Sequence, residues 1–94
     1  MKKSVRIYIT GVVQGVFFRA FVKENAEKLD VKGFTRNLED GRIEVFLEGD
    51  SDKVNEMVEL CRQGPKHSQI KNLEIIQIIK DPANAIWLLF VRGL

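Results

Sequence analysis

Cysteine is almost absent from this sequence, since Cys61 is the only one among 94 residues. A lone cysteine excludes a disulfide within the chain, and no CxxC pair or cysteine–histidine cluster offers a structural zinc site. Histidine is equally scarce, and we interpret its single representative, His67, as a solvated loop residue. We therefore expect a protein of a reducing compartment that holds no metal ion and no other cofactor.

Long hydrophobic runs are missing as well. The residues after the two N-terminal lysines alternate between apolar and polar, unlike a secretory signal, and no run approaches the length that spans a membrane. An excess of one charge is also missing, because 15 basic and 13 acidic residues are interspersed along the chain. Nucleic-acid binding needs clustered positive charge. We expect a soluble, cytoplasmic protein that binds neither membranes nor nucleic acid.

What the sequence does contain is enough for one hydrophobic core, so we expect a single domain over residues 1–94. Its first unit is a strand, a glycine loop and a helix. Alternating apolar residues predict a strand buried on one face and ended by Gly11. After the loop, apolar residues recur at the three-to-four-residue spacing of an amphipathic helix. These apolar positions are Val5, Ile7 and Ile9 in the strand, and Phe18, Val22, Ala26 and Leu29 in the helix.

A hairpin and a second helix follow. The pair Asp40-Gly41 predicts a two-residue turn between an extended segment, 31–38, and an alternating strand, 43–47. Asp50 or Ser51 is expected to cap the second helix through its side-chain oxygen. That helix is expected to stop at Gly64-Pro65, because proline cannot continue it. Its predicted buried residues are Val54, Met57, Val58 and Cys61.

Two further strands complete the prediction. Residues 70–79 and 85–91 are rich in β-branched and aliphatic side chains, and the breaker Asp81-Pro82-Ala83-Asn84 separates them. The element order is β-α-β-β-α-β with an added C-terminal strand. We therefore predict an α+β fold, the ferredoxin-like sandwich, in which two helices cover one face of an antiparallel sheet.

The loop between Gly11 and Arg19 has the outline of an anion site. Backbone N–H groups at a helix start point outward, the helix dipole favours negative charge, and a guanidinium matches phosphate oxygens as a planar fork. A plain strand-to-helix turn with a solvated arginine fits the same pattern, because short glycine loops are a weak signal. Asn37, similarly, sits before a hairpin turn, where asparagine is common for local reasons.

Two segments resemble the signature motifs of the acylphosphatase family. They are Gly11-x-Val13-Gln14-Gly15-Val16-x-Phe18-Arg19, and Gly33-Phe34-Thr35-Arg36-Asn37-x-x-Asp40-Gly41-x-Ile43-Glu44 followed by Gly49. The resemblance implies that Arg19 and Asn37 are the catalytic pair. It also implies a phosphate cradle formed by the backbone of Gln14, Gly15, Val16, Phe17, Phe18 and Arg19. The sequence departs from the family at three positions: Thr35 replaces a small aliphatic residue, Asp30 a frequent glycine, and Ser68 an alanine.

The implied activity is hydrolysis of the carboxyl-phosphate anhydride of an acyl phosphate to a carboxylate and inorganic phosphate. The carboxylate leaves without a general acid at neutral pH, because its conjugate acid has a pKa of about 4. We expect direct attack by water that Asn37 holds, with Arg19 and backbone N–H groups stabilising the phosphoryl charge without a metal. Cysteine-dependent phosphatases place their nucleophile six residues before the arginine that binds phosphate. In this sequence that position is Val13, six residues before Arg19, so a phosphocysteine intermediate is excluded. The expected partners are a small acyl phosphate and, at the same site, phosphate or sulfate, bound by a monomer.

Other functions of this fold are alternatives, and the sequence argues against the first two of them. An RNA-binding sheet would need several exposed aromatic residues, and the third predicted strand offers only Phe46, between Glu44 and Glu48. A soft-metal carrier would need paired cysteines in the first loop, which has none. A third alternative keeps the fold but loses turnover, as a regulatory domain that binds acyl phosphates or other anions. Tyr8 is expected to cover the sheet rather than to serve the site.

Overall fold

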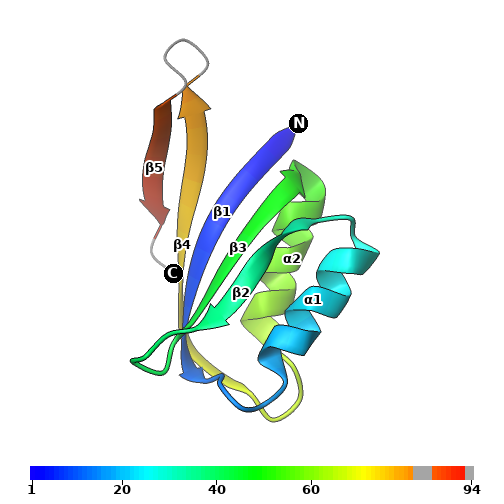
Figure 1. Cartoon of the computed structure of the whole chain (residues 1–94), viewed down its shortest axis with the longest axis vertical. Helices are drawn as coiled ribbons and strands as arrows, with labels where there is room; N and C mark the ends of the chain where they lie inside the picture. The colour runs from blue at the N-terminus through cyan, green and yellow to red at the C-terminus, as the bar shows by residue number, and fades with distance from the viewer. Residues whose placement is uncertain (82–85, 93–94) are drawn as a thin grey trace.

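The computed structural model describes the backbone of residues 1–81 and 86–92 and the side chains of residues 1–76. The described residues form two helices and five strands (Figure 1). Their order is the one that the sequence predicts, with an added strand after the β-α-β-β-α-β unit. The elements are β1 (Lys2–Val12), α1 (Phe18–Lys28), β2 (Lys32–Asn37), β3 (Ile43–Asp50), α2 (Ser51–Gln63), β4 (Gln69–Asp81) and β5 (Ile86–Arg92).

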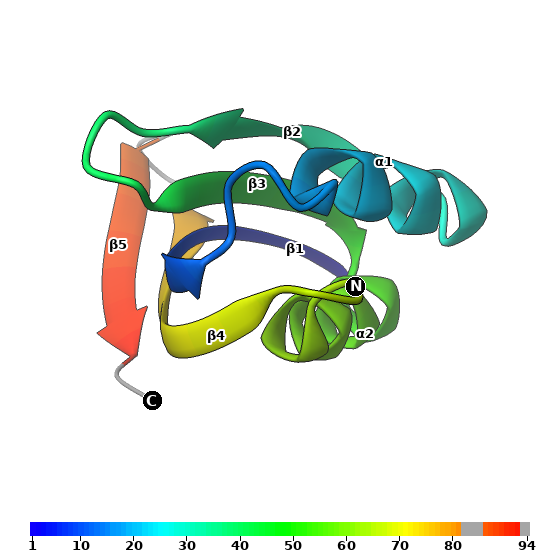
Figure 2. The ribbon, with the colours of Figure 1, turned by 90° about the horizontal axis from the view of Figure 1, so that it is seen from below.

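The strands form one antiparallel sheet in the order β2-β3-β1-β4-β5. Both helices lie on the same face of the sheet, as Figure 2 shows from below. This arrangement confirms the predicted ferredoxin-like sandwich. The added strand, β5, pairs with the distal part of β4 at one edge, so it lies far from α1 (Figure 1). The predicted breaker residues 82–84, and residue 85 of the predicted last strand, lie outside the described residues.

The core lies between the sheet and the two helices. Its sheet side comes from alternate residues of β1 and β3, because successive side chains of a strand point to opposite faces. The predicted apolar stripe of α2 is confirmed, since all four of its expected residues are buried. In α1 two residues of the predicted stripe are buried and two are partly buried against the core. The core residues named for these elements are Val5, Ile7, Ile9, Phe18, Val22, Ile43, Val45, Leu47, Val54, Met57, Val58 and Cys61.

The first strand does not end at Gly11, as the sequence predicted, but continues to Val12. Its register against β4 shifts between Thr10 and Gly11, which marks a bulge. A Cβ atom on Gly11 would lie 1.9 Å from the backbone oxygen of Gln69. Glycine is therefore needed here, because the backbone of Gln69 approaches closely inside the sheet. Since β1 ends at Val12 and α1 begins at Phe18, the strand-to-helix loop is only five residues long.

The β2–β3 hairpin also differs from the predicted two-residue turn. The Leu38 N–H donates to the Arg42 oxygen at 2.8 Å, and the Gly41 N–H donates to the Leu38 oxygen at 3.2 Å. Glu39 and Asp40 are thus the central residues of the turn, and only Gly41 takes a positive φ, of 94°. A turn followed by a left-handed residue is the usual way to build a slightly longer hairpin loop. This loop sets the register in which β2, up to its last residue Asn37, pairs with β3.

Helix boundaries follow the predicted positions but not every predicted cap. Asp50 stands at the N-cap of α2, yet its side chain makes no capping hydrogen bond and lies 3.3 Å from Lys2 Nζ instead. The side-chain cap expected from Asp50 or Ser51 was therefore wrong. At the other end Gly64 takes a positive φ of 69°, as the stop signal predicted. Asp30 after α1 has φ of 56°, a left-handed conformation that glycine adopts most readily.

Candidate active site

The loop from Val13 to Phe17 has a backbone shaped to hold an anion. Gly15 has φ of 74° and Phe17 has φ of 63°, and Val16 between them keeps a negative φ. Alternation of left-handed and ordinary residues turns successive N–H groups toward one point. Phe17 is not glycine and its ring is 85% exposed, so burial does not compensate its left-handed conformation. Backbone strain of this kind is typical of functional sites.

The start of α1 adds further unpaired donors. Phe17 is the N-cap residue, and its side chain has no oxygen that would accept from the first-turn N–H groups. The N–H groups of the first turn lack intrahelical acceptors and carry the positive end of the helix dipole. Arg19 is the second residue of this helix, so its guanidinium and the helix N-terminus favour the same anion.

Gln14 connects the loop 13–17 to the second signature motif. Its side-chain Nε2 donates to the Leu38 oxygen at 2.8 Å and to the Arg42 oxygen at 2.9 Å. These two carbonyls lie on either side of the β2–β3 turn, so one side chain holds both ends of the hairpin loop. Its neighbour Asn37 is the last residue of β2 and pairs with Ile43 of β3. Because Ile43 is buried under the helices, Asn37 lies on the helix side of the sheet.

Arg19 and Asn37 meet in one pocket of about 260 Å³. The pocket contains four of the six predicted cradle residues; Gln14 and Val16 do not line it, since Gln14 bonds to the hairpin and Val16 packs against the core. Three lining residues were missed from the sequence. Val13 stands inside the first motif, Ala20 directly after it and Ile43 inside the second motif, but only the hairpin register explains why Ile43 lies beside Asn37. The lining is Val13, Gly15, Phe17, Phe18, Arg19, Ala20, Asn37 and Ile43.

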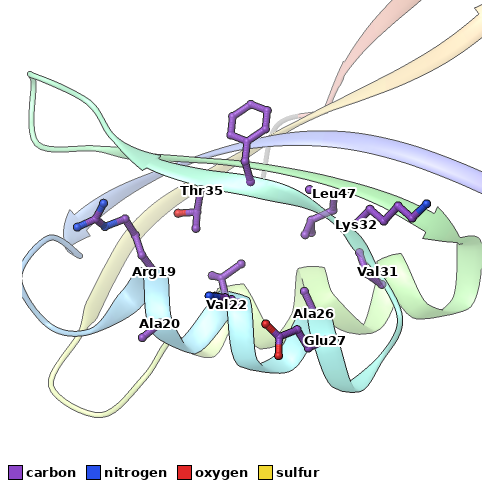
Figure 3. Close-up of a pocket in the computed structure, with 12 residues that line it drawn as sticks. Arg19, Ala20, Val22, Ala26, Glu27, Val31, Lys32, Thr35 and Leu47 are labelled. Atoms are coloured by element: carbon purple, nitrogen blue, oxygen red, sulfur yellow. The ribbon is translucent and has the colours of Figure 1, made fainter.

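A larger groove of about 590 Å³ runs between α1 and β2, next to this pocket. Arg19 and Ala20 line both cavities. Figure 3 shows the side chains of α1 and β2 facing each other across the groove. Its walls are largely apolar, and Thr35 places a hydroxyl in it. The sequence indicated Thr35 only as a departure from the family and gave no sign of a cavity.

The opposite face of the sheet carries a separate cluster around Glu44, which is 1% exposed. Glu44 accepts hydrogen bonds from Arg6 at 2.7 Å, from Tyr8 at 3.1 Å and from Arg36. Burial raises the pKa of Glu44, but the bonds from Arg36, Tyr8 and Arg6 outweigh it, so its pKa is lowered. Tyr8 therefore covers the open face, as expected, and does not belong to the pocket.

Two aromatic residues, Phe34 and Phe46, pack together on the same face of the sheet. The rings of Phe34 and Phe46 stack with centroids 5.6 Å apart. The Arg6 guanidinium lies 5.9 Å and 5.7 Å from the two ring centroids. The sequence placed Phe34 only within a motif, because its pairing with Phe46 is known only from the strand register. Arg6 also forms an ion pair with the Glu44 carboxylate, so it connects the two rings to the cluster around Glu44.

The remaining reactive side chains lie outside the pocket. Burial raises the pKa of the Cys61 thiol to about 12, in agreement with its interpretation as a structural residue of α2. His67 is exposed in the loop after α2, with φ of 75°. Within the part of the chain that the structure describes, no three histidine, cysteine or acidic residues are grouped to hold a metal ion.

Fold and site together define an α+β protein of the ferredoxin-like class with a pocket at a strand-to-helix loop, lined by Arg19 and Asn37. The acylphosphatase family model matches residues 5–84 of the chain. The acylphosphatase of Rubrobacter xylanophilus is 48% identical over 73 residues, which are 78% of this chain and 66% of that protein. That of Syntrophus aciditrophicus is 44% identical over 82% of this chain and 80% of its own length. The chain belongs to the acylphosphatase family.

Solved structures agree with this assignment. The crystal structure of the acylphosphatase from Bacillus subtilis superposes with a TM-score of 0.78 at 34% identity, over 82% of this chain and 84% of that one. The chain is therefore a hydrolase with acylphosphatase function, and the alternative of a regulatory domain without turnover is not favoured.

Proposed function

We propose that the pocket between the loop 13–17 and β2 is the acylphosphatase active site. The observation that carries this proposal is the convergence of Arg19 and Asn37, from two separate motifs, on one pocket of about 260 Å³. The left-handed residues Gly15 and Phe17 turn backbone N–H groups toward the same space. The cradle of residues 14–19 then binds the phosphate group of a small acyl phosphate, and the Arg19 guanidinium binds two of its oxygens.

Hydrolysis proceeds in one step in this proposal. The oxygen of a water that Asn37 holds bonds to phosphorus as the bond from phosphorus to the acyl oxygen breaks. The carboxylate leaves with the electron pair of that bond, and the water gives up its proton to solvent. The negative charge on the phosphoryl oxygens is stabilised by Arg19 and the N–H groups of the helix start. Neither a divalent cation nor a covalent intermediate takes part.

The other expectations for this chain are also part of the proposal. Inorganic phosphate and sulfate occupy the same cradle, because it is shaped for a tetrahedral anion. Residues 1–94 act as a single, monomeric domain of the cytoplasm, without nucleic-acid or membrane partners. The described helices include none that is long and apolar enough to cross a membrane.

Release of inorganic phosphate from benzoyl phosphate in excess EDTA tests the proposed reaction. We expect full turnover in the chelator and competitive inhibition by added phosphate. Loss of turnover in EDTA that magnesium restores contradicts the metal-independent mechanism. Tight phosphate binding without any turnover of benzoyl phosphate contradicts the enzymatic function and favours a regulatory domain.

A further inference from the structure

The groove between α1 and β2 continues from the phosphate pocket along the helix. Arg19 and Ala20 line both cavities, and the groove then follows the helix past Val22 and Ala26 to Glu27. Eight residues of helix span about 12 Å, at a rise of about 1.5 Å per residue. The opposite wall comes from β2 and the residue before it, with Leu47 of β3 behind (Figure 3). A ligand anchored at Arg19 thus has an apolar channel leading away from its phosphate.

The two cavities divide the same strand between them. Asn37 and Thr35 are two residues apart on β2, so they point to the same face, but Asn37 lines only the phosphate pocket and Thr35 only the groove. In-line displacement requires the attacking water and the leaving carboxylate on opposite sides of phosphorus. If Asn37 holds the water, as proposed above, the adjoining groove, which Asn37 does not line, is the space available to the leaving group.

The hydroxyl of Thr35 also indicates that a ligand binds in the groove. Its Oγ1 is buried, and no residue that the structure describes provides it with a hydrogen-bond partner. Leaving a buried hydroxyl without a partner is unfavourable, so a ligand that offers an acceptor there gains affinity. Figure 3 shows the hydroxyl in the space between β2 and α1, toward the end of the groove where Arg19 lies.

We propose that this groove binds the acyl chain of the substrate and that the Thr35 hydroxyl donates a hydrogen bond to the oxygen of the acyl carbonyl. This inference rests on the proposed function. The leaving carboxylate shares its charge between two oxygens, so a donor to the former carbonyl oxygen also stabilises the departing group. The apolar walls, among them Val22, Ala26 and Leu47, select unbranched acyl chains of intermediate length over acetyl.

The first test compares acetyl phosphate with octanoyl phosphate on the complete chain. Each buried methylene contributes to binding, so we expect kcat/KM to be at least tenfold higher for octanoyl phosphate. In the Ala26→Leu variant the groove is narrowed, and this preference should fall about tenfold. Turnover of both substrates without any dependence on chain length overturns the acyl groove and leaves the proposed function intact. Absence of turnover for every acyl phosphate overturns the function itself.

The second test uses Thr35→Val, which keeps the branched shape and removes the hydroxyl. We expect kcat/KM to fall about tenfold for both substrates, while the inhibition constant of inorganic phosphate, which lacks an acyl oxygen, stays the same. The melting temperature should not fall, since the lost hydroxyl has no partner in the protein. Thr10→Val, on the other face of the sheet, is the matched control and should change none of these values. A Thr35→Val protein with normal kcat/KM refutes the role of the hydroxyl.

Discussion

Arg19 and Asn37 share one pocket but offer different chemistry. A guanidinium carries charge and a planar pair of donors that match phosphate, whereas a neutral carboxamide only positions what it bonds to. In the proposed mechanism the charged Arg19 binds the phosphate group, and the carboxamide of Asn37 holds the attacking water. The two side chains should therefore respond differently to removal, although both are exposed and neither supports the core.

For the arginine we predict that Arg19→Ala weakens phosphate binding and lowers kcat together, and that Arg19→Lys restores little. A lysine ammonium is a point charge and does not reproduce the fork. Asn37→Ala should instead lower kcat by about a hundredfold or more while phosphate affinity stays nearly unchanged. Titration with phosphate and turnover of benzoyl phosphate measure both quantities. An Asn37→Ala protein that loses phosphate binding as severely as Arg19→Ala contradicts this division of roles.

At the scale of elements, the site depends on two loops that are held together by one side chain. Gln14 belongs to the loop before α1, and its two hydrogen bonds reach the carbonyls of Leu38 and Arg42 in the β2–β3 loop. Asn37 immediately precedes Leu38 in the chain. We infer that Gln14, which sequence reasoning assigned only to phosphate, positions the carboxamide of Asn37 relative to the loop 13–17.

We predict that Gln14→Ala lowers kcat by about tenfold, because a small displacement of a positioning group slows the reaction more than it weakens binding. The free energy of unfolding should fall by about 1–3 kcal/mol, since two carbonyls lose their donor. Urea denaturation and turnover of benzoyl phosphate measure these effects. Gln63→Ala, at the exposed end of α2, is the control. If kcat is unaffected while stability falls, Gln14 is structural and does not position Asn37.

At the scale of the whole molecule, Glu44 links three strands of the sheet. Its carboxylate accepts bonds from Arg6 and Tyr8 of β1 and from Arg36 of β2, and it stands itself on β3. The cluster lies on the face opposite the pocket. It therefore contributes to the stability of the sheet that carries the site, without touching substrate.

The lowered pKa of Glu44 predicts a specific dependence of stability on pH. A carboxylate whose pKa is depressed in the folded state stabilises the protein above the pKa of the unfolded chain, and this contribution is lost as pH falls through the folded pKa. Glu44→Gln should cost about 2 kcal/mol at pH 7 and nearly nothing well below pH 4. Glu74→Gln, exposed on the same face, is the control. Equal destabilisation by Glu44→Gln at both pH values would rule out this linkage.

The sequence by itself determined the order of elements and the two helical stripes, and the resemblance of its motifs to a family indicated the pair Arg19 and Asn37. Periodicity and motif spacing are local properties, so they can be recognised without knowledge of the fold. Its errors were also local. Strand β1 passes through Gly11 because a bulge and the backbone of Gln69 accommodate it, and Asp50 bonds to Lys2 rather than to its helix.

Only the tertiary structure decided which residues from distant parts of the sequence lie opposite each other. The pairing of Asn37 with Ile43, the contact of Gln14 with the hairpin and the cluster around Glu44 depend on strand register, which joins residues distant in the sequence. The groove with Thr35 lies between α1 and β2, and residues of both elements form its walls. A cavity is a property of two surfaces at once, so no pattern along one segment specifies it.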